Sequence, residues 1–97
     1  MKEIAFTPQA EEDVKEAYEW YKEQKAGLGD DFMLCLEAVL KSMKRNSGIY
    51  QRIHKEARRA VLRRFPYNVI YTIEEDEIVV HAVFHARRDP RKFLYRV

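Results

Sequence analysis

The chain has 97 residues, of which 46% are hydrophobic and 35% charged, and its formal net charge is +2. This length fits one domain with a small core, and the hydrophobic share argues against an intrinsically disordered chain. No apolar run is long enough for a transmembrane helix, and the N-terminal MKEIAF lacks the apolar stretch of a secretory signal peptide. We therefore expect a single cytoplasmic domain over residues 1–97, without a membrane partner.

The charges are unevenly distributed along the chain. Residues 1–49 carry 7 Lys and Arg against 10 Asp and Glu, whereas residues 50–97 carry 11 against 6. The positive second half suits an anionic partner such as nucleic acid or an acidic protein segment, although a solvated sheet face is the simpler interpretation. The single Cys35 lies among apolar helix positions, which indicates an inert core thiol in a reducing compartment.

The first half of the chain predicts a short strand followed by a helical hairpin. The strand covers residues 2–6. Thr7 and Pro8 are then typical of a helix N-cap and first helical position, and Gly27 is a natural stop. A second apolar stripe at helical spacing predicts a helix from about Asp30 to Arg45. Only a few residues separate the helices, so they should lie antiparallel.

The second half predicts three strands, at residues 57–65, 67–74 and 77–86. Residues 49–56 are expected to form a loop before them, and residues 91–95 a helical turn. The turns at 65–66 and 75–76 are short, which requires antiparallel neighbours. The order βααβββ therefore predicts an α+β, two-layer domain, with the hairpin packed on one face of a small, mainly antiparallel sheet and the other face partly open.

The sequence offers no convincing metal or cofactor site. His54, His81 and His85 lack the paired Cys or His spacing of a metal site, and no glycine-rich phosphate loop is present. No Ser-His-Asp or Cys-His signature is visible either. We expect neither a metal nor a small-molecule cofactor.

What remains for chemistry is an array of Arg, His and Tyr side chains on the strands and the tail. Metal-free RNA cleavage needs a base, cationic donors on the scissile phosphate and an acid; Arg can hold the phosphate, and His or Tyr can move protons. The same array could hold an acidic peptide or DNA phosphates. The residues expected to bind a target or a partner are Arg58, Arg63, Arg64, Arg87 and Arg91.

The second half of the chain contains RRFPYNVIY, an acidic turn, IVVHAVFHARRDP and a closing aromatic-plus-Arg tail. These phrases resemble the RelE/ParE superfamily of bacterial toxins, in the subgroup often labelled plasmid-stabilisation proteins. The resemblance runs from about Ile4 to Arg96. It implies the same α+β fold. It also implies the toxin of a type II toxin–antitoxin pair, which inhibits growth through a macromolecular target and is neutralised by a cognate antitoxin.

Similarity to the ribosome-dependent mRNA interferases of that superfamily implies a set of candidate catalytic residues. Arg59 and Arg88 fall where basic residues of the catalytic face are expected, and Tyr95 lies within a residue of a functional tail Tyr. His85 or Tyr95 would then move protons. The candidate catalytic set is Arg59, His85, Arg88 and Tyr95.

Two positions depart from the interferase pattern. Asn68 and Val61 stand where a catalytic Arg and a Lys are expected. Loss of one transition-state donor typically costs ~10²–10³ in rate, so two losses would remove most of the catalysis. A ParE-like toxin that acts on DNA gyrase does not need that array. We therefore expect gyrase as the target, with a ribosome-dependent mRNA endoribonuclease, or an inactive member that only binds its antitoxin, as the alternatives.

Overall fold

The computed structural model describes residues 2–97 and confirms the predicted α+β order. The strands form one sheet in the order β1-β5-β4-β3-β2, in which β1 is parallel to β5 and all other neighbours are antiparallel. None of the described helices is both long and apolar enough to cross a membrane. The elements are β1 (Glu3–Phe6), α1 (Pro8–Gln24), α2 (Leu28–Arg45), β2 (Arg52–His54), β3 (Ala57–Val61), β4 (Tyr67–Ile73), β5 (Glu77–His85) and the 3-10 turns η1 (Pro90–Lys92) and η2 (Leu94–Arg96).

The helical hairpin begins at the predicted cap. The Thr7 hydroxyl accepts a hydrogen bond from the Ala10 N–H at 3.1 Å, and Pro8 occupies the first turn of α1, where a missing N–H costs nothing. The second helix begins two residues earlier than predicted. Gly27, at φ 84°, turns the chain directly into α2 instead of ending α1, which finishes at Gln24.

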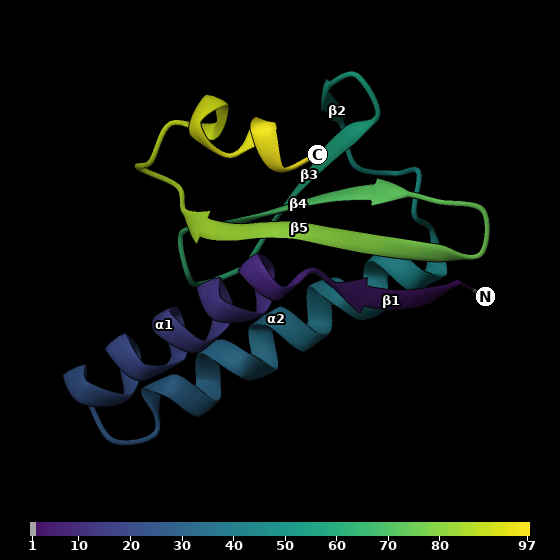
Figure 1. Ribbon diagram of the computed structural model, residues 1–97. Coiled ribbons are helices and arrows are strands. Elements are labelled where there is room, and N and C mark those ends of the chain that lie inside the picture. The colour runs from purple at the N-terminus through teal and green to yellow at the C-terminus, as the bar shows by residue number, and fades with distance from the viewer. Residues whose placement is uncertain (1) are drawn as a thin grey trace.

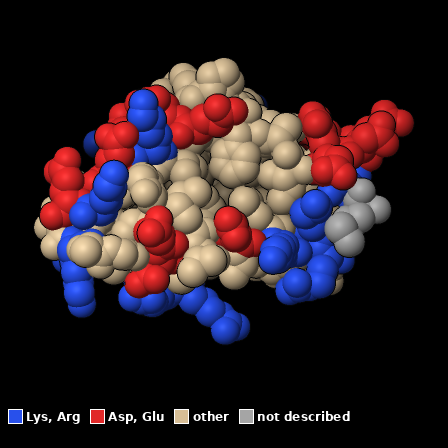
Figure 2. Space-filling model, turned by 90° about the horizontal axis from the view of Figure 1, so that it is seen from below, with Lys and Arg blue, Asp and Glu red and all other residues tan. Residues whose placement is uncertain are grey.

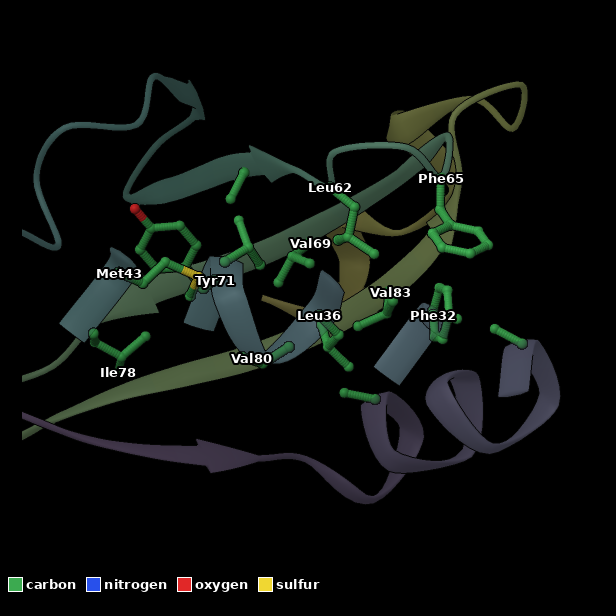
Figure 3. Close-up of a cluster of buried hydrophobic side chains, with 14 of the residues drawn as sticks. Phe32, Leu36, Met43, Leu62, Phe65, Val69, Tyr71, Ile78, Val80 and Val83 are labelled. Carbon is green, nitrogen blue, oxygen red and sulfur yellow. The ribbon is translucent and has the colours of Figure 1, made fainter. Parts of the chain in front are cut away.

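The hairpin covers one face of the sheet, which we call the helix face (Figure 1). Phe32, Leu36 and Met43 of α2 pack there against Val69 and Tyr71 of β4, all almost fully buried (Figure 3). The Tyr71 hydroxyl donates to the Ser47 carbonyl at 2.7 Å, so the one polar atom of this ring is satisfied inside the core. Burial raises the pKa of Tyr71 to about 12.

The opposite face, which we call the tail face, is covered by the two C-terminal turns (Figure 1). The Phe93 ring stacks on Phe84 of β5 with ring centroids 4.0 Å apart and an interplanar angle of 6°. Ala57, Ile70 and Ala82 complete this smaller apolar cluster. The tail covers the middle of that face only, which agrees with the expectation of a partly open second face.

Two strand boundaries also differ from the sequence prediction. The strand expected at 57–65 ends at Val61, because Arg64 adopts a left-handed backbone at φ 72° and Phe65 turns into the core at 5% exposure. The loop expected at 49–56 contains the three-residue strand β2, which pairs with the start of β3. The strands β4 and β5 agree with prediction to within one residue.

Candidate functional site

The sheet places the candidate catalytic residues on two different faces. Arg59 of β3 lies opposite Ile70 of β4, and Tyr67 of β4 lies opposite His85 of β5. Residues that lie directly opposite each other on neighbouring strands point to the same face of the sheet. Side chains alternate along a strand, so Ile70 points to the tail face and Tyr67, three residues away, points to the helix face. Arg59 is therefore on the tail face, whereas His85 is on the helix face. Tyr95 lies in η2 with 73% of its side chain exposed.

One cavity brings two of the four candidates together. It has a volume of about 290 Å³ and lies between α1 and the adjoining ends of β4 and β5; we call it the α1 cleft. His85 and Arg88 line it, and Arg59 and Tyr95 do not. The other lining residues that matter for chemistry are Asp13, Glu16, Trp20 and Tyr67.

The imidazole of His85 is oriented by its own strand end. Its Nδ1 accepts a hydrogen bond from the Arg87 backbone N–H at 3.0 Å, so the neutral ring carries its proton on Nε2. The ring also packs edge-on against Tyr67, with centroids 5.4 Å apart. Burial raises the pKa of the Tyr67 phenol and neighbouring Tyr21 raises it further, whereas the charge of Arg88 lowers it.

The guanidinium of Arg88 is held at the rim of the cleft by an aromatic ring. It lies 4.7 Å from the centroid of Phe93, which is only 3% exposed. Contact with an aromatic face leaves the N–H groups in the guanidinium plane able to donate to an anion. Arg88 forms no ion pair with the residues at positions 2–97.

The carboxylate of Asp13 is a feature that the sequence reasoning missed. Its Oδ2 accepts from Arg96 Nη1 at 2.6 Å and from the Val83 backbone N–H at 3.0 Å. The sequence analysis does not single out Asp13 as a candidate residue. Its position, three residues after Ala10 and four before Ala17, places it on the buried stripe of α1 and was the available signal.

Several other arginines of the basic half bind acceptors of their own chain. Arg58 donates to the Tyr50 carbonyl at 2.7 Å, and Arg64 pairs with Asp31 at 3.2 Å. Arg91 pairs with Asp89 at 2.7 Å and lowers the pKa of that carboxyl. Arg63 lines a second cavity beside α2 together with Val61, and Arg87 is exposed. Within positions 2–97, no three His, Cys, Asp or Glu side chains gather closely enough to hold a metal ion.

The outer surface of the hairpin exposes apolar side chains. Trp20 of α1 is 56% exposed and Leu34 of α2 is 63% exposed. Figure 2 views this side of the molecule and shows an uncharged area that contains a few acidic groups and is bordered by basic and acidic ones. Exposed aromatic and aliphatic side chains of this kind are typical of protein-binding surfaces.

Comparisons with known proteins agree with this architecture. The chromosomal ParDE toxin–antitoxin system from P. aeruginosa contains a chain with a TM-score of 0.65 and 15% identity, over 90% of this chain and 98% of that one. The YoeB dimer from Staphylococcus aureus gives a TM-score of 0.56 and 24% identity, over 87% and 97%. No curated protein matches.

These structural similarities show the fold alone, whereas the comparison with family models shows the family. A family model described as the ParE toxin of the type II toxin–antitoxin system parDE matches residues 4–90. This range includes most of β1, the helical hairpin, the remaining four strands and the first residue of η1. The chain therefore belongs to the ParE toxin family of type II toxin–antitoxin systems.

Proposed function

We propose that this toxin inhibits growth by acting on DNA gyrase and that it does not cleave mRNA. The observation that carries the proposal is the separation of Arg59 from His85 on opposite faces of the sheet. Cleavage of RNA requires the base, the acid and the cationic donors to converge within hydrogen-bond reach of one phosphate. Arg59, His85 and Tyr95 do not converge in this way, so the arrangement favours a toxin that works by binding.

The residues of the tail face support the same conclusion. Asn68 is 4% exposed and lies opposite Phe84, and Val61 lies opposite Asn68. The Phe84–Phe93 stack fills the neighbouring surface. A neutral amide and apolar side chains therefore occupy the area where a nuclease of the resembled kind would place two cations. Each missing donor is expected to reduce the rate by about 10²–10³.

A cognate antitoxin is the second partner that we propose. The P. aeruginosa chain to which this one is similar comes from a ParDE toxin–antitoxin system. An extended antitoxin segment would place apolar side chains over Trp20 and Leu34 on the hairpin and acidic ones beside the arginines. The reversal Arg59→Glu with Arg88→Glu should weaken the complex at low salt. An unchanged affinity would remove those arginines from the interface.

Ribosome-dependent mRNA cleavage is the alternative function, and the α1 cleft is the observation that favours it. The cleft combines a proton-transfer group in His85, a phenol in Tyr67 and a phosphate-binding group in Arg88. These three would have to perform the reaction without Arg59 or Tyr95.

The experiment that separates the two functions runs two assays side by side. Supercoiling by gyrase and primer extension on translated mRNA are each measured with the wild type and with the Arg59→Ala/Arg88→Ala double variant. The Lys15→Ala/Lys41→Ala variant, which removes two charges from exposed helix positions, is the control. We expect inhibition of supercoiling and no codon-positioned cleavage by the wild type. Robust cleavage that disappears in the double arginine variant would overturn the proposal, and inactivity in both assays would leave only antitoxin binding.

A further inference from the structure

We propose that the α1 cleft binds a single nucleotide unit, with a preference for guanine, through Trp20, Glu16 and Arg88. The unit can be a free mononucleotide or one residue of a single-stranded RNA, because the recognised chemistry is the same. The proposal does not depend on gyrase or on the ribosome, since binding is measured with the toxin alone.

The aromatic wall of the cleft is suited to a flat ring. Trp20 is 56% exposed, yet its indole is held edge-on against Tyr21 with ring centroids 5.1 Å apart. Tyr67 and His85 line the same cleft from the sheet side. An exposed but positioned indole is a good surface for base stacking, which every nucleobase can use.

The cationic group of the cleft is Arg88. Its guanidinium lies over the buried Phe93 ring, so the side chain is positioned before any ligand arrives. A planar guanidinium with free N–H groups matches two phosphate oxygens at once. Arg88 therefore provides the site for the phosphate of the nucleotide.

The carboxylate that remains available in the cleft is that of Glu16. Asp13 is already neutralised by Arg96 and also accepts from Val83, whereas Glu16 forms no ion pair within the described residues 2–97. An ionised carboxylate has two acceptor oxygens and no donor. Guanine presents an adjacent N1–H and amino group to such a pair. Adenine presents only its amino group on that edge and uracil only one N–H, so guanine should bind best.

Size and charge both argue against an acidic peptide as the occupant. Small-ligand sites start at roughly 300 Å³, and the cleft, at about 290 Å³, has room for one nucleotide unit. An acidic peptide would meet the Glu16 carboxylate as well as the Arg88 cation. A nucleotide instead offers an anion at one end and N–H donors at the other, which fits one cation and one carboxylate.

Trp20 is the only tryptophan of the chain, so its fluorescence reports on the cleft directly. The folded toxin is titrated with GMP, AMP, UMP and inorganic phosphate, and with a single-stranded RNA trinucleotide that has a central G. We expect saturable quenching, with an affinity that decreases from GMP to AMP to UMP. The variant Arg88→Gln should weaken GMP binding at least about tenfold, the loss expected for a hydrogen bond to a charged group. Lys92→Gln removes a positive charge from an exposed position outside the cleft and should change the affinity less than about twofold.

Glu16→Gln tests the base preference separately from the phosphate. It should bring the GMP and AMP affinities together while leaving UMP almost unchanged, and Glu19→Gln on the exposed side of α1 is its control. Tighter binding of the trinucleotide than of GMP assigns the site to RNA, and the reverse order assigns it to the free nucleotide; either result supports the site. The absence of saturable quenching, equal competition by inorganic phosphate alone, or an unchanged GMP affinity in Arg88→Gln would overturn it.

Discussion

Asp13 of α1 and Arg96 of the last turn form an ion pair of 2.6 Å across 83 residues of sequence, with only 15% and 12% of their side chains exposed. The same Asp13 oxygen accepts the Val83 backbone N–H, and Arg96 also donates to the His81 carbonyl at 3.2 Å. This network joins the first helix, strand β5 and the C-terminal tail. It therefore fixes the end of the tail relative to α1 and to the cleft beside it.

The first prediction is that Asp13→Ala destabilises the fold. It removes the partner of a mostly buried cation and the acceptor of a backbone N–H, so we expect a loss of about 2–3 kcal/mol, somewhat below the range for fully buried pairs. Urea denaturation gives the free energy of unfolding, and a double-mutant cycle with Arg96→Ala isolates the pair. The exposed pair Arg52–Glu56, at 3.6 Å, is the control, and Arg52→Ala should cost less than about 0.5 kcal/mol. Similar small losses at both pairs would contradict the prediction.

The second prediction concerns pH and His81. Burial lowers the pKa of its imidazole, and its Nε2 lies 2.9 Å from the Thr72 hydroxyl. The unfolded chain therefore binds a proton at a higher pH than the folded chain does. The neutral His81 side chain therefore contributes fully to stability above the unfolded pKa of about 6.5. This contribution is lost as the pH falls from there through the lower pKa of the folded chain.

The measurement is the urea midpoint at several pH values between 5 and 8. The midpoint should fall on the acid side of about pH 6.5 in the wild type. His81→Gln keeps a hydrogen-bonding side chain without a titrating ring, and it should flatten that part of the curve. His54→Gln, at an exposed position of β2, should leave the curve unchanged. Parallel curves for the wild type and His81→Gln would assign the pH dependence to other groups.

The third prediction tests the closure of the tail face. Phe93→Ala removes a ring that is 3% exposed and stacked on Phe84, so we expect a loss of about 3 kcal/mol. The Arg96 amide, which donates to the Phe93 carbonyl, should exchange its hydrogen faster as the tail detaches. Tyr95→Ala, two residues away at 73% exposure, should cost less than about 0.5 kcal/mol. Equal effects at the two positions would mean that the tail is not anchored by Phe93.

Local patterns in the sequence were enough to predict most of the fold. The cap at Thr7 and the apolar stripes specified the hairpin, and the aromatic and β-branched run from Tyr67 specified β4. These features depend on neighbouring residues only. The end of β3 depends instead on the left-handed backbone of Arg64 and on the burial of Phe65, and β2 depends on pairing with β3. Such tertiary requirements override local propensity.

The arrangement of the candidate site was less predictable, because it depends on register between strands. The sequence grouped Arg59, His85, Arg88 and Tyr95 by residue type. Strand pairing places Arg59 and His85 on opposite faces, and a register shift between β4 and β5 next to Ile70 sets which residues of β5 point toward the helices. The contact between Asp13 and Arg96 spans almost the whole chain, so the sequence does not identify Arg96 as the partner of Asp13. Only the buried spacing of Asp13 along α1 pointed to it.

The last prediction concerns Gly29, which lies in the first turn of α2 against Tyr18 and Lys22 of α1. A Cβ atom at Gly29 would lie 2.9 Å from the Tyr18 carbonyl oxygen and 3.2 Å from the Lys22 Cβ. The carbonyl belongs to the backbone of α1 and cannot rotate away, so the helices would have to separate. Replacing Gly by Ala inside a helix otherwise gains up to about 1 kcal/mol, whereas overpacking costs about 1–3 kcal/mol. We therefore expect Gly29→Ala to destabilise the protein by about 1–2 kcal/mol in urea denaturation.

Gly48→Ala is the matched control, because nothing lies within 4 Å of its added Cβ and its backbone is not left-handed. It should be neutral or stabilising by up to about 1 kcal/mol. A stabilised Gly29→Ala variant would show that the hairpin has more room at this point than its geometry indicates.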